Sequence, residues 1–354
     1  MSDTRAQELT TWANRVIAQR HPAAAPNAGL ETVSGDASFR RYFRLSAPDY
    51  SYIAVDAPPA HEDSATFVHI ARLFRAAQVS APEVIASDFD QGFMLLQDFG
   101  DTLYLGVLLQ AQTSGDLAVA DTLYEAALKA LVTLQAGVNK ETLAPYDRER
   151  LRREMSLFEE WFCERFLELA LSPAERSCIA DAFTFLEDAA LAQHQVVVHR
   201  DYHSRNLLVL DAARVPNDAS PGVIDFQDAV AGAYTYDLVS LLRDCYIRWE
   251  TPQLQHWIAR YRDLARQAGV IDGVQDAQLQ RDFDLMGLQR HLKVMGIFAR
   301  LAIRDHKTRY LADIPLVIRY FLEVCGNYPE LSSFHDWFSA TVLPVARPRL
   351  NLEF

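Results

Sequence analysis

The polar segment His199-Arg200-Asp201-Tyr202-His203-Ser204-Arg205-Asn206 lies between two apolar runs at residues 196–198 and 207–210. A further apolar run ends in Ile224-Asp225-Phe226, and Asp225 lies nineteen residues beyond Asn206. Short apolar runs bounded by polar turn residues are typical of buried strands. We therefore expect residues 196–226 to form a strand-rich insert with polar side chains at the strand ends.

Three side chains of this insert suit the transfer of a phosphoryl group. A carboxylate such as Asp201 can orient an incoming hydroxyl and accept its proton, while an amide oxygen and a second carboxylate are hard ligands that Mg²⁺ prefers. Any one of them alone would usually be a turn-former. Their combination at this spacing indicates phosphoryl-transfer chemistry, with Asp201 as the catalytic base and Asn206 and Asp225 as the metal ligands.

The chain before the insert begins with a helix and continues with short strands. Leu9, Trp12 and Ile17 recur at helical spacing, residues 4–7 offer a capping box, and His21-Pro22 ends the helix. Short strands are expected at residues 38–45, 52–55, 83–87 and 93–97, with a helix at 67–77. This pattern predicts a small sheet with one inserted helix.

Beyond a hinge at residues 97–101 the pattern becomes mostly helical. Apolar residues at helical spacing predict helices at residues 117–134, 150–169 and 174–192, and several more after residue 236. We therefore predict an α+β fold with a nucleotide-binding lobe at residues 1–97. A helical lobe at residues 98–354 would carry the catalytic loop and the substrate site.

Composition excludes several classes of protein. The 354 residues are 50% hydrophobic and 23% charged, as in globular proteins, and the net charge of −13 argues against coating nucleic acid. Four scattered cysteines, with no pair at zinc-ligand spacing, suit a reducing compartment. No apolar leader precedes the first helix, and no apolar run reaches the roughly 18 residues of a membrane span. We expect a cytoplasmic protein with neither nucleic-acid nor membrane partners.

The catalytic block resembles that of the aminoglycoside phosphotransferase and choline kinase group, small-molecule relatives of protein kinases. The resemblance implies a two-lobed, protein-kinase-like fold with a small antiparallel β lobe, and it implies ATP and Mg²⁺ as cofactors. By position, Asp201 would be the base, and Asn206 and Asp225 would hold Mg²⁺ against the phosphates. His199 would be structural, and Asp237 would brace the catalytic loop, although Asp237 could equally be a helix N-cap.

A narrower resemblance rests on residues 34–44, 55–59, 224–229 and 289–296. These segments look like those of the anomeric sugar kinases of cell-wall recycling, which phosphorylate N-acetylmuramate and N-acetylglucosamine. The resemblance implies a sugar substrate and a downstream sugar-1-phosphate uridylyltransferase that takes the product. The alternatives are a kinase for another small alcohol, such as choline or an aminoglycoside, and a nucleotide-binding pseudokinase that acts as a scaffold.

The chain departs from the kinase pattern at the usual phosphate-binding lysine. That residue normally ends the third strand, where Asp56 stands here. The sequence has 30 Arg but only four Lys, at positions 129, 140, 293 and 307, so no realignment restores it. Arg40, Tyr42 and Arg44 alternate along one strand face, so Tyr42 could support adenine while the two guanidinium groups hold phosphates. A solvated edge hairpin would look the same.

Other contacts to the nucleotide are expected from backbone and hydroxyl groups. Ser34 and Ser38 flank a loop whose N–H and hydroxyl groups could cap phosphates, although an ordinary hairpin turn would read alike. The hinge from Gln97 to Phe99 would offer backbone groups to adenine.

The acceptor site is expected to be cationic. His203 and Arg205 lie in the catalytic loop, and Arg290, His291 and Lys293 lie together in a late helix. A cationic pocket suits an anionic acceptor such as the lactyl carboxylate of N-acetylmuramate, and would repel an aminoglycoside. For a charged helix stripe the alternative is a solvated surface.

Overall fold

The computed structural model describes residues 3–22, 29–34, 39–48 and 50–354. The chain packs into two compact units, one formed by Met1–Tyr104 and Asn206–Asp228 and the other by Leu105–Arg205 and Ala229–Phe354. The division predicted at residue 97 therefore falls inside the first unit. Residues 206–228 of the insert, which were assigned to the helical lobe, also pack with the first unit.

The first unit is built on a five-stranded antiparallel sheet with strand order β1-β2-β3-β5-β4. The strands are β1 (Glu31–Ser34), β2 (Arg41–Ala47), β3 (Tyr50–Asp56), β4 (Val84–Asp88) and β5 (Phe93–Gln97). β3 lies between β2 and β5, with Ala54 opposite Phe43 on one side and Leu95 on the other. The predicted strands are present, although β2 begins three residues later than expected.

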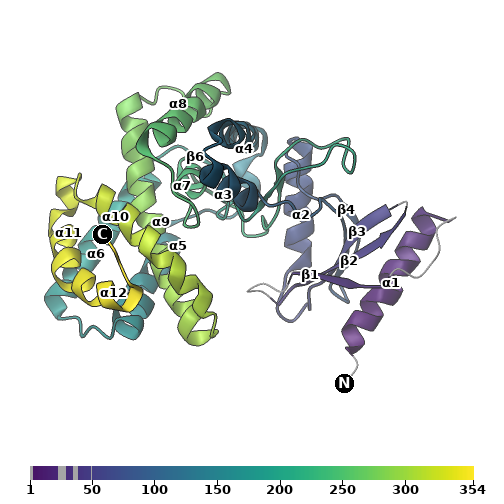
Figure 1. Cartoon of the computed structure of the whole chain (residues 1–354), viewed down its shortest axis with the longest axis horizontal. Coiled ribbons are helices and arrows are strands. Elements are labelled where there is room, and N and C mark those ends of the chain that lie inside the picture. Colours follow the sequence, from purple (N-terminus) through teal and green to yellow (C-terminus); the bar gives the residue numbers. More distant parts are fainter. Residues whose placement is uncertain (1–2, 23–28, 35–38, 49) are drawn as a thin grey trace. The chain divides into compact units, whose positions relative to one another are not determined.

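Helix α1 (Thr4–Arg20) covers one face of this sheet (Figure 1). Its apolar stripe, including Leu9 and Ile17, is buried together with Phe43 and Leu45 of β2. The predicted alternation along β2 therefore holds, and Tyr42 and Arg44 project to the opposite face. The N-cap is Asp3, whose carboxylate accepts the N–H of Ala6, so the N-cap lies one residue before the predicted capping box at residues 4–7.

Helix α2 (Ser64–Ala76) connects β3 to β4 and receives the returning segment 206–228. The rings of Phe67 and Phe74 lie 4.8 and 5.5 Å from the ring of Phe226. The short strands β7 (Leu207–Leu208) and β8 (Gly222–Val223) pair with each other in the same unit. These contacts explain why a segment distant in sequence belongs to the sheet unit.

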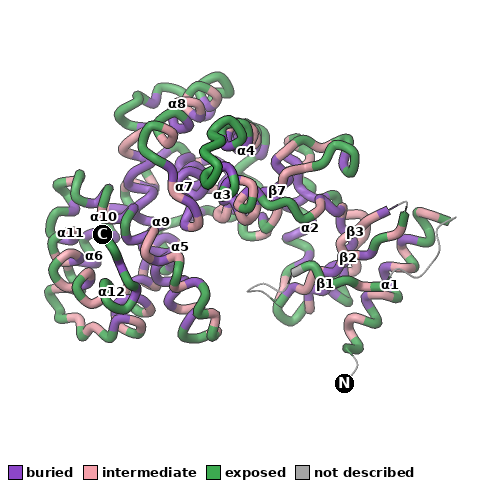
Figure 2. Tube along the Cα trace, in the orientation of Figure 1, coloured by how far each residue is buried: buried purple, intermediate pink, exposed green. Residues whose placement is uncertain are grey.

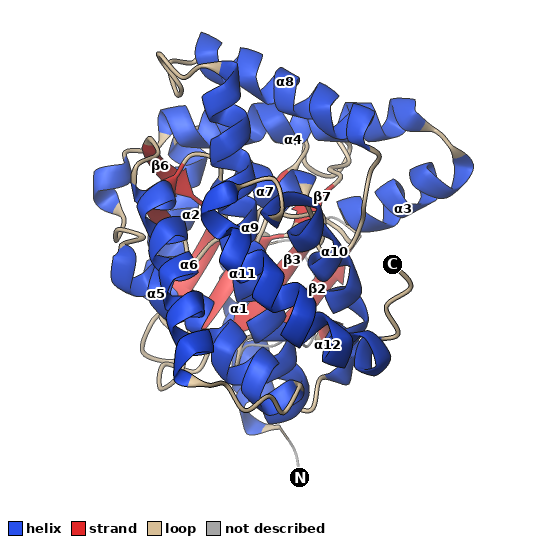
Figure 3. Ribbon diagram, turned by 90° about the vertical axis from the view of Figure 1, so that its left-hand side faces the viewer, coloured by secondary structure: helices blue, strands red, loops and turns tan. Residues whose placement is uncertain are grey.

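The second unit is mostly helical (Figure 3). Its one pair of regular strands in the described part of the chain is β6 (Gln195–Val198) with β9 (Val230–Ala233). The helices are α3 (Tyr104–Ser114), α4 (Leu117–Gly137), α5 (Arg148–Leu157), the π-helical η2 (Phe158–Phe166), α6 (Pro173–Leu191), α7 (Tyr236–Leu242), α8 (Thr251–Gln267), α9 (Asp276–Arg304), α10 (Ile314–Cys325), α11 (Ser332–Trp337) and α12 (Leu343–Leu350). Shorter turns are η1 (Lys140–Thr142), η3 (Thr308–Asp313), η4 (Pro329–Leu331) and η5 (Phe338–Val342).

The long helix α9 forms the centre of the second unit, and its residues 282–296 are all buried (Figure 2). It packs against α5, η2, α6, α7 and α10. At Gly296 the helix α9 lies very close to the end of α5, because a Cβ there would lie 2.3 Å from the carbonyl carbon of Leu157. The polar side chains Arg290 and Lys293 are therefore interior groups, which excludes the solvated-stripe alternative for them.

Within the described ranges, no helix combines the length and the hydrophobicity that crossing a membrane requires.

Candidate active site

The catalytic loop leaves β6 and is held by a buried carboxylate from α7. Asp237 accepts the backbone N–H groups of His199, at 2.6 Å, and of Arg200, at 3.0 Å. It lies in the first turn of α7, whose N-cap residue is Thr235, so Asp237 is not the N-cap. Burial raises the pKa of Asp237 to about 7, against the opposing effect of these two N–H groups.

A second buried carboxylate, which the sequence did not reveal, holds the other half of the loop. Asp244 accepts the backbone N–H of Ser204 at 3.0 Å and also its hydroxyl. Its other oxygen accepts the N–H of Tyr246 at 3.1 Å. Between the two braces, Arg200 adopts a left-handed φ of +79°, a conformation that costs energy for a residue with a Cβ. The loop shape is therefore imposed by its surroundings.

Asp201 presents a carboxylate that is 42% exposed and lies among cations of the second unit. The Nη2 of Arg290 lies 3.9 Å from its Oδ1. Burial by itself would raise the pKa of Asp201, but the positive charges of Lys293 and Arg290, among others, lower it to about 2. Asp201 is therefore ionised throughout the physiological pH range.

Glu154 of α5 forms ion pairs with two cations near Asp201, Arg200 and Lys293. It accepts hydrogen bonds from the guanidinium of Arg200 and the hydroxyl of Tyr146, and its Oε2 lies 2.9 Å from Nζ of Lys293. Lys293 also donates to the hydroxyl of Tyr236 at 2.9 Å. Sequence reasoning missed Glu154, although a carboxylate on an otherwise apolar helix face was a detectable signal.

The other residues predicted to contact the acceptor sugar lie either in the buried helix α9 or in the catalytic loop. Arg290 donates to Ser240 Oγ at 2.7 Å. His291 is 1% exposed and its ring stacks on Tyr320 of α10 at 5.4 Å, so we do not retain it as a substrate contact. In the catalytic loop, the Arg205 guanidinium lies over the ring of Tyr246, and His203 packs edge-to-face against the same ring.

In the first unit, Asn206 and Asp225 come together at the strand pair β7–β8. The backbone N–H of Ile224 donates to the carbonyl of Asn206 at 3.1 Å, and Asn206 Nδ2 lies 3.4 Å from Asp225 Oδ2. Gln227 Nε2 donates to the other carboxylate oxygen at 2.9 Å. Oxygen donors from a carboxylate and an amide fit Mg²⁺, which keeps most of its shell for waters and phosphates. No group of three or more His, Cys, Asp or Glu side chains forms a metal centre in the described part of the chain.

A cavity of about 340 Å³ in the first unit is lined by Arg40, Glu62, Asp63, Thr66, Gln227 and Asp228. Arg40 is 6% exposed, and its Nη2 forms an ion pair with Glu62 at 2.8 Å. The pKa of the neighbouring Tyr42 is raised to about 12, mainly by burial. The charge of Asp225 adds to this rise, and the charge of Arg40 opposes it. The charged groups of Arg40 and Asp225 are therefore close enough to Tyr42 to influence its ionisation.

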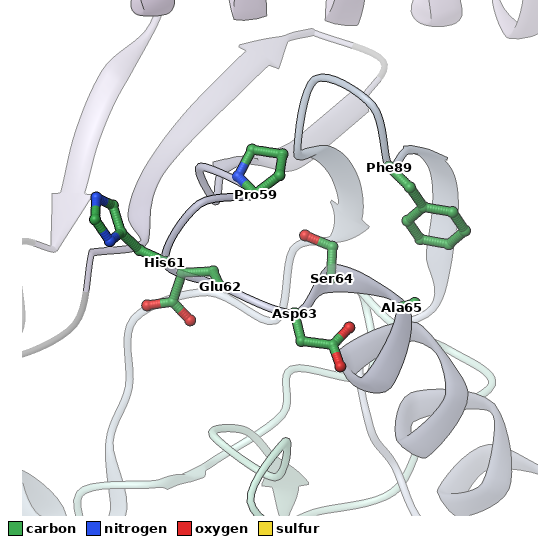
Figure 4. Close-up of a pocket in the computed structure, with 7 residues that line it drawn as sticks. All are labelled: Pro59, His61, Glu62, Asp63, Ser64, Ala65 and Phe89. Carbon is green, nitrogen blue, oxygen red and sulfur yellow. The ribbon is translucent and has the colours of Figure 1, made fainter.

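A second cavity, of about 460 Å³, opens at the start of α2. Figure 4 shows His61 and Phe89 on its two sides, with Pro59 and Ser64 between them. Glu62 lines both cavities. The carboxylate that orients Arg40 therefore stands at the junction of the two cavities.

The two arginines of β2, which follow Arg40 in the sequence, pair with other carboxylates. Arg44 makes ion pairs at 2.8 Å with both Asp98 and Asp101. Arg41 pairs with Asp3 and with the fully buried Asp56, which stands where kinases usually carry lysine. These pairs leave Arg40 as the arginine of this segment that lines the cavity.

The remaining predicted nucleotide contacts are placed as follows. The Gln97 side chain donates to Asp218 at 2.8 Å, and Phe99 is buried in a small cluster with Leu208 and Val215. Ser34 ends β1, but its side chain and the whole of Ser38 lie outside the described residues. Contacts from this loop to phosphate remain predictions.

Residues 29–270 match the family described as the phosphotransferase enzyme family. The chain belongs to this phosphotransferase family. The phosphotransferase is 40% identical over 338 residues to the N-acetylmuramate/N-acetylglucosamine kinase of Pseudomonas putida, which spans 94% of this chain and 96% of that one. It is 39% identical over 329 residues to the protein of the same name from Neisseria meningitidis, covering 93% of each chain.

Solved structures support the same fold. An ethanolamine kinase of Plasmodium vivax superimposes with a TM-score of 0.59 at 13% identity, covering 92% of this phosphotransferase and 90% of that chain. A choline kinase of Streptococcus pneumoniae gives a TM-score of 0.58 at 11% identity, covering 87% and 98%. The predicted kinase-like α+β fold, with a small antiparallel sheet and a larger helical part, is confirmed.

Proposed function

We propose that this phosphotransferase moves the γ-phosphoryl group of ATP to the anomeric hydroxyl of N-acetylmuramate and N-acetylglucosamine. The observation that carries the proposal is the 40% identity, over 94% of the chain, to a kinase named for these two sugars. The presence of Asp201, Asn206 and Asp225 at the spacing of a phosphoryl-transfer site supports it.

In the proposed reaction, Asp201 binds and orients the sugar hydroxyl. Its carboxylate is partly exposed, and the neighbouring Lys293 and Arg290 keep it ionised, so it can accept a hydrogen bond from the hydroxyl. A carboxylate with a pKa of about 2 is a weak base, so orientation would contribute more than early proton removal. The proton would pass to Asp201 as the oxygen–phosphorus bond forms.

Asn206 and Asp225 would hold Mg²⁺, which when bound offsets charge on the phosphates of ATP. Arg40 would supply the cation that lysine supplies in other kinases. Its burial beside Glu62 and its position in the cavity with Gln227 and Asp228 support this role. The hinge at Gln97–Phe99 and the loop at residues 34–38 would contact adenine and phosphate through backbone groups.

The product would be a sugar 1-phosphate. Its chemistry suits a nucleotidyltransferase that couples such phosphates to a nucleoside triphosphate, and we propose a uridylyltransferase as the enzyme that consumes it. The cytoplasm, which contains ATP and Mg²⁺, is the proposed compartment.

The proposal is tested by measuring ADP release with N-acetylmuramate, N-acetylglucosamine, choline and kanamycin as separate acceptors. We expect turnover with the two amino sugars, and loss of that turnover by roughly 10²- to 10⁴-fold in Asp201→Asn with ATP affinity largely retained. Turnover with choline or kanamycin alone would contradict the sugar assignment. No turnover with any acceptor would indicate a nucleotide-binding scaffold.

A further inference from the structure

The cations around Asp201 differ in whether they already have an anionic partner. Arg200 and Lys293 share Glu154, and Arg290 is oriented by Ser240 beside Asp201 itself. In the described part of the chain, no ion pair joins Arg205 to a carboxylate. It is therefore the cation of the catalytic loop whose charge the protein does not neutralise by direct contact.

The orientation of Arg205 is set by an aromatic platform. Its guanidinium carbon lies 3.6 Å from the centroid of the Tyr246 ring. The backbone N–H of Tyr246 donates to Asp244, the same carboxylate that holds Ser204, so the platform and the loop share one brace. A guanidinium stacked on a ring directs its N–H groups outward in its own plane, which suits bidentate contact with a carboxylate.

A second polar group packs against the same ring. His203 packs edge-to-face on Tyr246, with ring centroids 5.4 Å apart. It is 9% exposed, and its Nδ1 is buried without a hydrogen-bond partner among the described residues. Burial lowers the pKa of His203, which favours the neutral ring. A buried nitrogen without a partner is costly unless something occupies it.

Two carboxylates near Tyr246 or Arg205 leave the charge of Arg205 without a direct partner. Asp244 is occupied by the N–H groups of Ser204 and Tyr246. Asp313 is close enough for the charge of Arg205 to lower its pKa, although burial dominates and the net pKa is raised. Neither carboxylate forms an ion pair with Arg205, so its N–H edge can bind an external anion.

We propose that Arg205 and His203, arranged on Tyr246, form the subsite that recognises an anionic substituent of the acceptor sugar. The substituent is the lactyl carboxylate by which N-acetylmuramate differs from N-acetylglucosamine. This inference rests on the proposed function and assigns acceptor discrimination within it. Asp201, four residues earlier in the same loop, would orient the hydroxyl of either sugar.

N-acetylglucosamine, which lacks the lactyl carboxylate, serves as an internal control for N-acetylmuramate in each variant. In Arg205→Gln we expect kcat/KM for N-acetylmuramate to fall by roughly 10- to 100-fold, because a charge-assisted bidentate contact is lost. Turnover of N-acetylglucosamine should be nearly unchanged, which would also show that the variant is folded. Arg205→Lys keeps the charge but not the planar fork, so its loss for N-acetylmuramate should be intermediate.

Arg248→Gln is the matched control. Arg248 is a half-buried arginine of the same unit that pairs with Glu250 and Glu323, and its loss should leave the ratio of the two kcat/KM values unchanged. An equal fall for both sugars in Arg205→Gln and Arg205→Lys, or an unchanged ratio, would overturn the subsite. A wild-type enzyme that uses N-acetylglucosamine alone would also overturn it while the kinase assignment stands. A wild-type enzyme that uses neither sugar would instead refute the proposed function.

Discussion

At the scale of single residues, Asp237 and Asp244 support the catalytic loop mainly by accepting hydrogen bonds from its backbone N–H groups. Each accepts two or more hydrogen bonds while almost fully buried. Buried donors left without an acceptor are costly. The loop that carries Asp201 should therefore depend strongly on both braces.

Replacing Asp237 tests this dependence. In Asp237→Ala the N–H groups of His199 and Arg200 lose their acceptor, so the free energy of unfolding should fall by about 2–5 kcal/mol. We expect kcat to fall more than the KM for ATP changes, because the loop that orients the acceptor is loosened. Urea unfolding and steady-state kinetics measure the two effects. Asp336→Ala, at an exposed carboxylate, is the control, and a stable, fully active Asp237→Ala would refute the role.

For the arginines near β2, the sequence predicts the face of the strand but not the pairing partner. Alternation correctly placed Tyr42 and Arg44 on the face opposite α1, and it suggested both Arg40 and Arg44 as phosphate ligands. Pairing partners from distant positions favour Arg40 over Arg44, since Arg44 meets Asp98 and Asp101 while Arg40 meets Glu62 at the cavity. Such partners cannot be read from strand periodicity.

Arg40→Ala should raise the KM for ATP by roughly 10- to 100-fold, because a charge-assisted contact to phosphate is lost. Arg44→Ala should leave that KM nearly unchanged but lower the free energy of unfolding by about 1–3 kcal/mol, because the buried Asp98 loses its main partner. Kinetics with varied ATP and thermal unfolding separate the two outcomes. A larger KM change in Arg44→Ala than in Arg40→Ala would reverse our assignment.

At the scale of elements, α9 is the helix whose environment matters most for the site. Its polar residues Arg290 and Lys293 were expected to face a substrate. In the structure they reach Asp201 and Glu154 from within the core, and their contact with a substrate stays a prediction. Helical spacing identified the helix correctly. Burial of its polar side depends on the carboxylate of α5 and the hydroxyl groups of α7, which lie far away in the sequence.

The close approach of α9 to the segment around Leu157 gives a test of that packing. In Gly296→Ala the new methyl would meet the backbone of Leu157 at 2.3 Å, so we expect a loss of about 1–3 kcal/mol or more in the free energy of unfolding. Gly106→Ala, in α3, meets nothing within 4 Å and should stabilise the protein by up to about 1 kcal/mol. Denaturant midpoints compare the two, and an equal effect at both positions would contradict the packing argument.

At the scale of the whole molecule, the sheet unit is discontinuous in sequence. Most strands and helices could be predicted, because local periodicity carries them, although α3 and β9 were not. The roles of Asp201, Asn206 and Asp225 stay predictions from motif spacing. The return of residues 206–228 to the first unit could not, because it depends on Phe226 packing against Phe67 and Phe74. For the same reason Glu154 and Asp244 were missed as partners of the catalytic loop.

The placement of the four lysines, all in the second unit, has a consequence for covalent labelling. Reactive ATP analogues that acylate a lysine beside the phosphates should leave residues 1–104 and 206–228 unmodified at every side chain, because that unit contains no lysine. Dicarbonyl reagents, which attack guanidinium groups, should instead inactivate the enzyme, and bound ATP should protect it. Lysine-directed profiling of nucleotide-binding proteins would therefore leave the first unit of this phosphotransferase unlabelled, and arginine-directed probes would be needed to detect it.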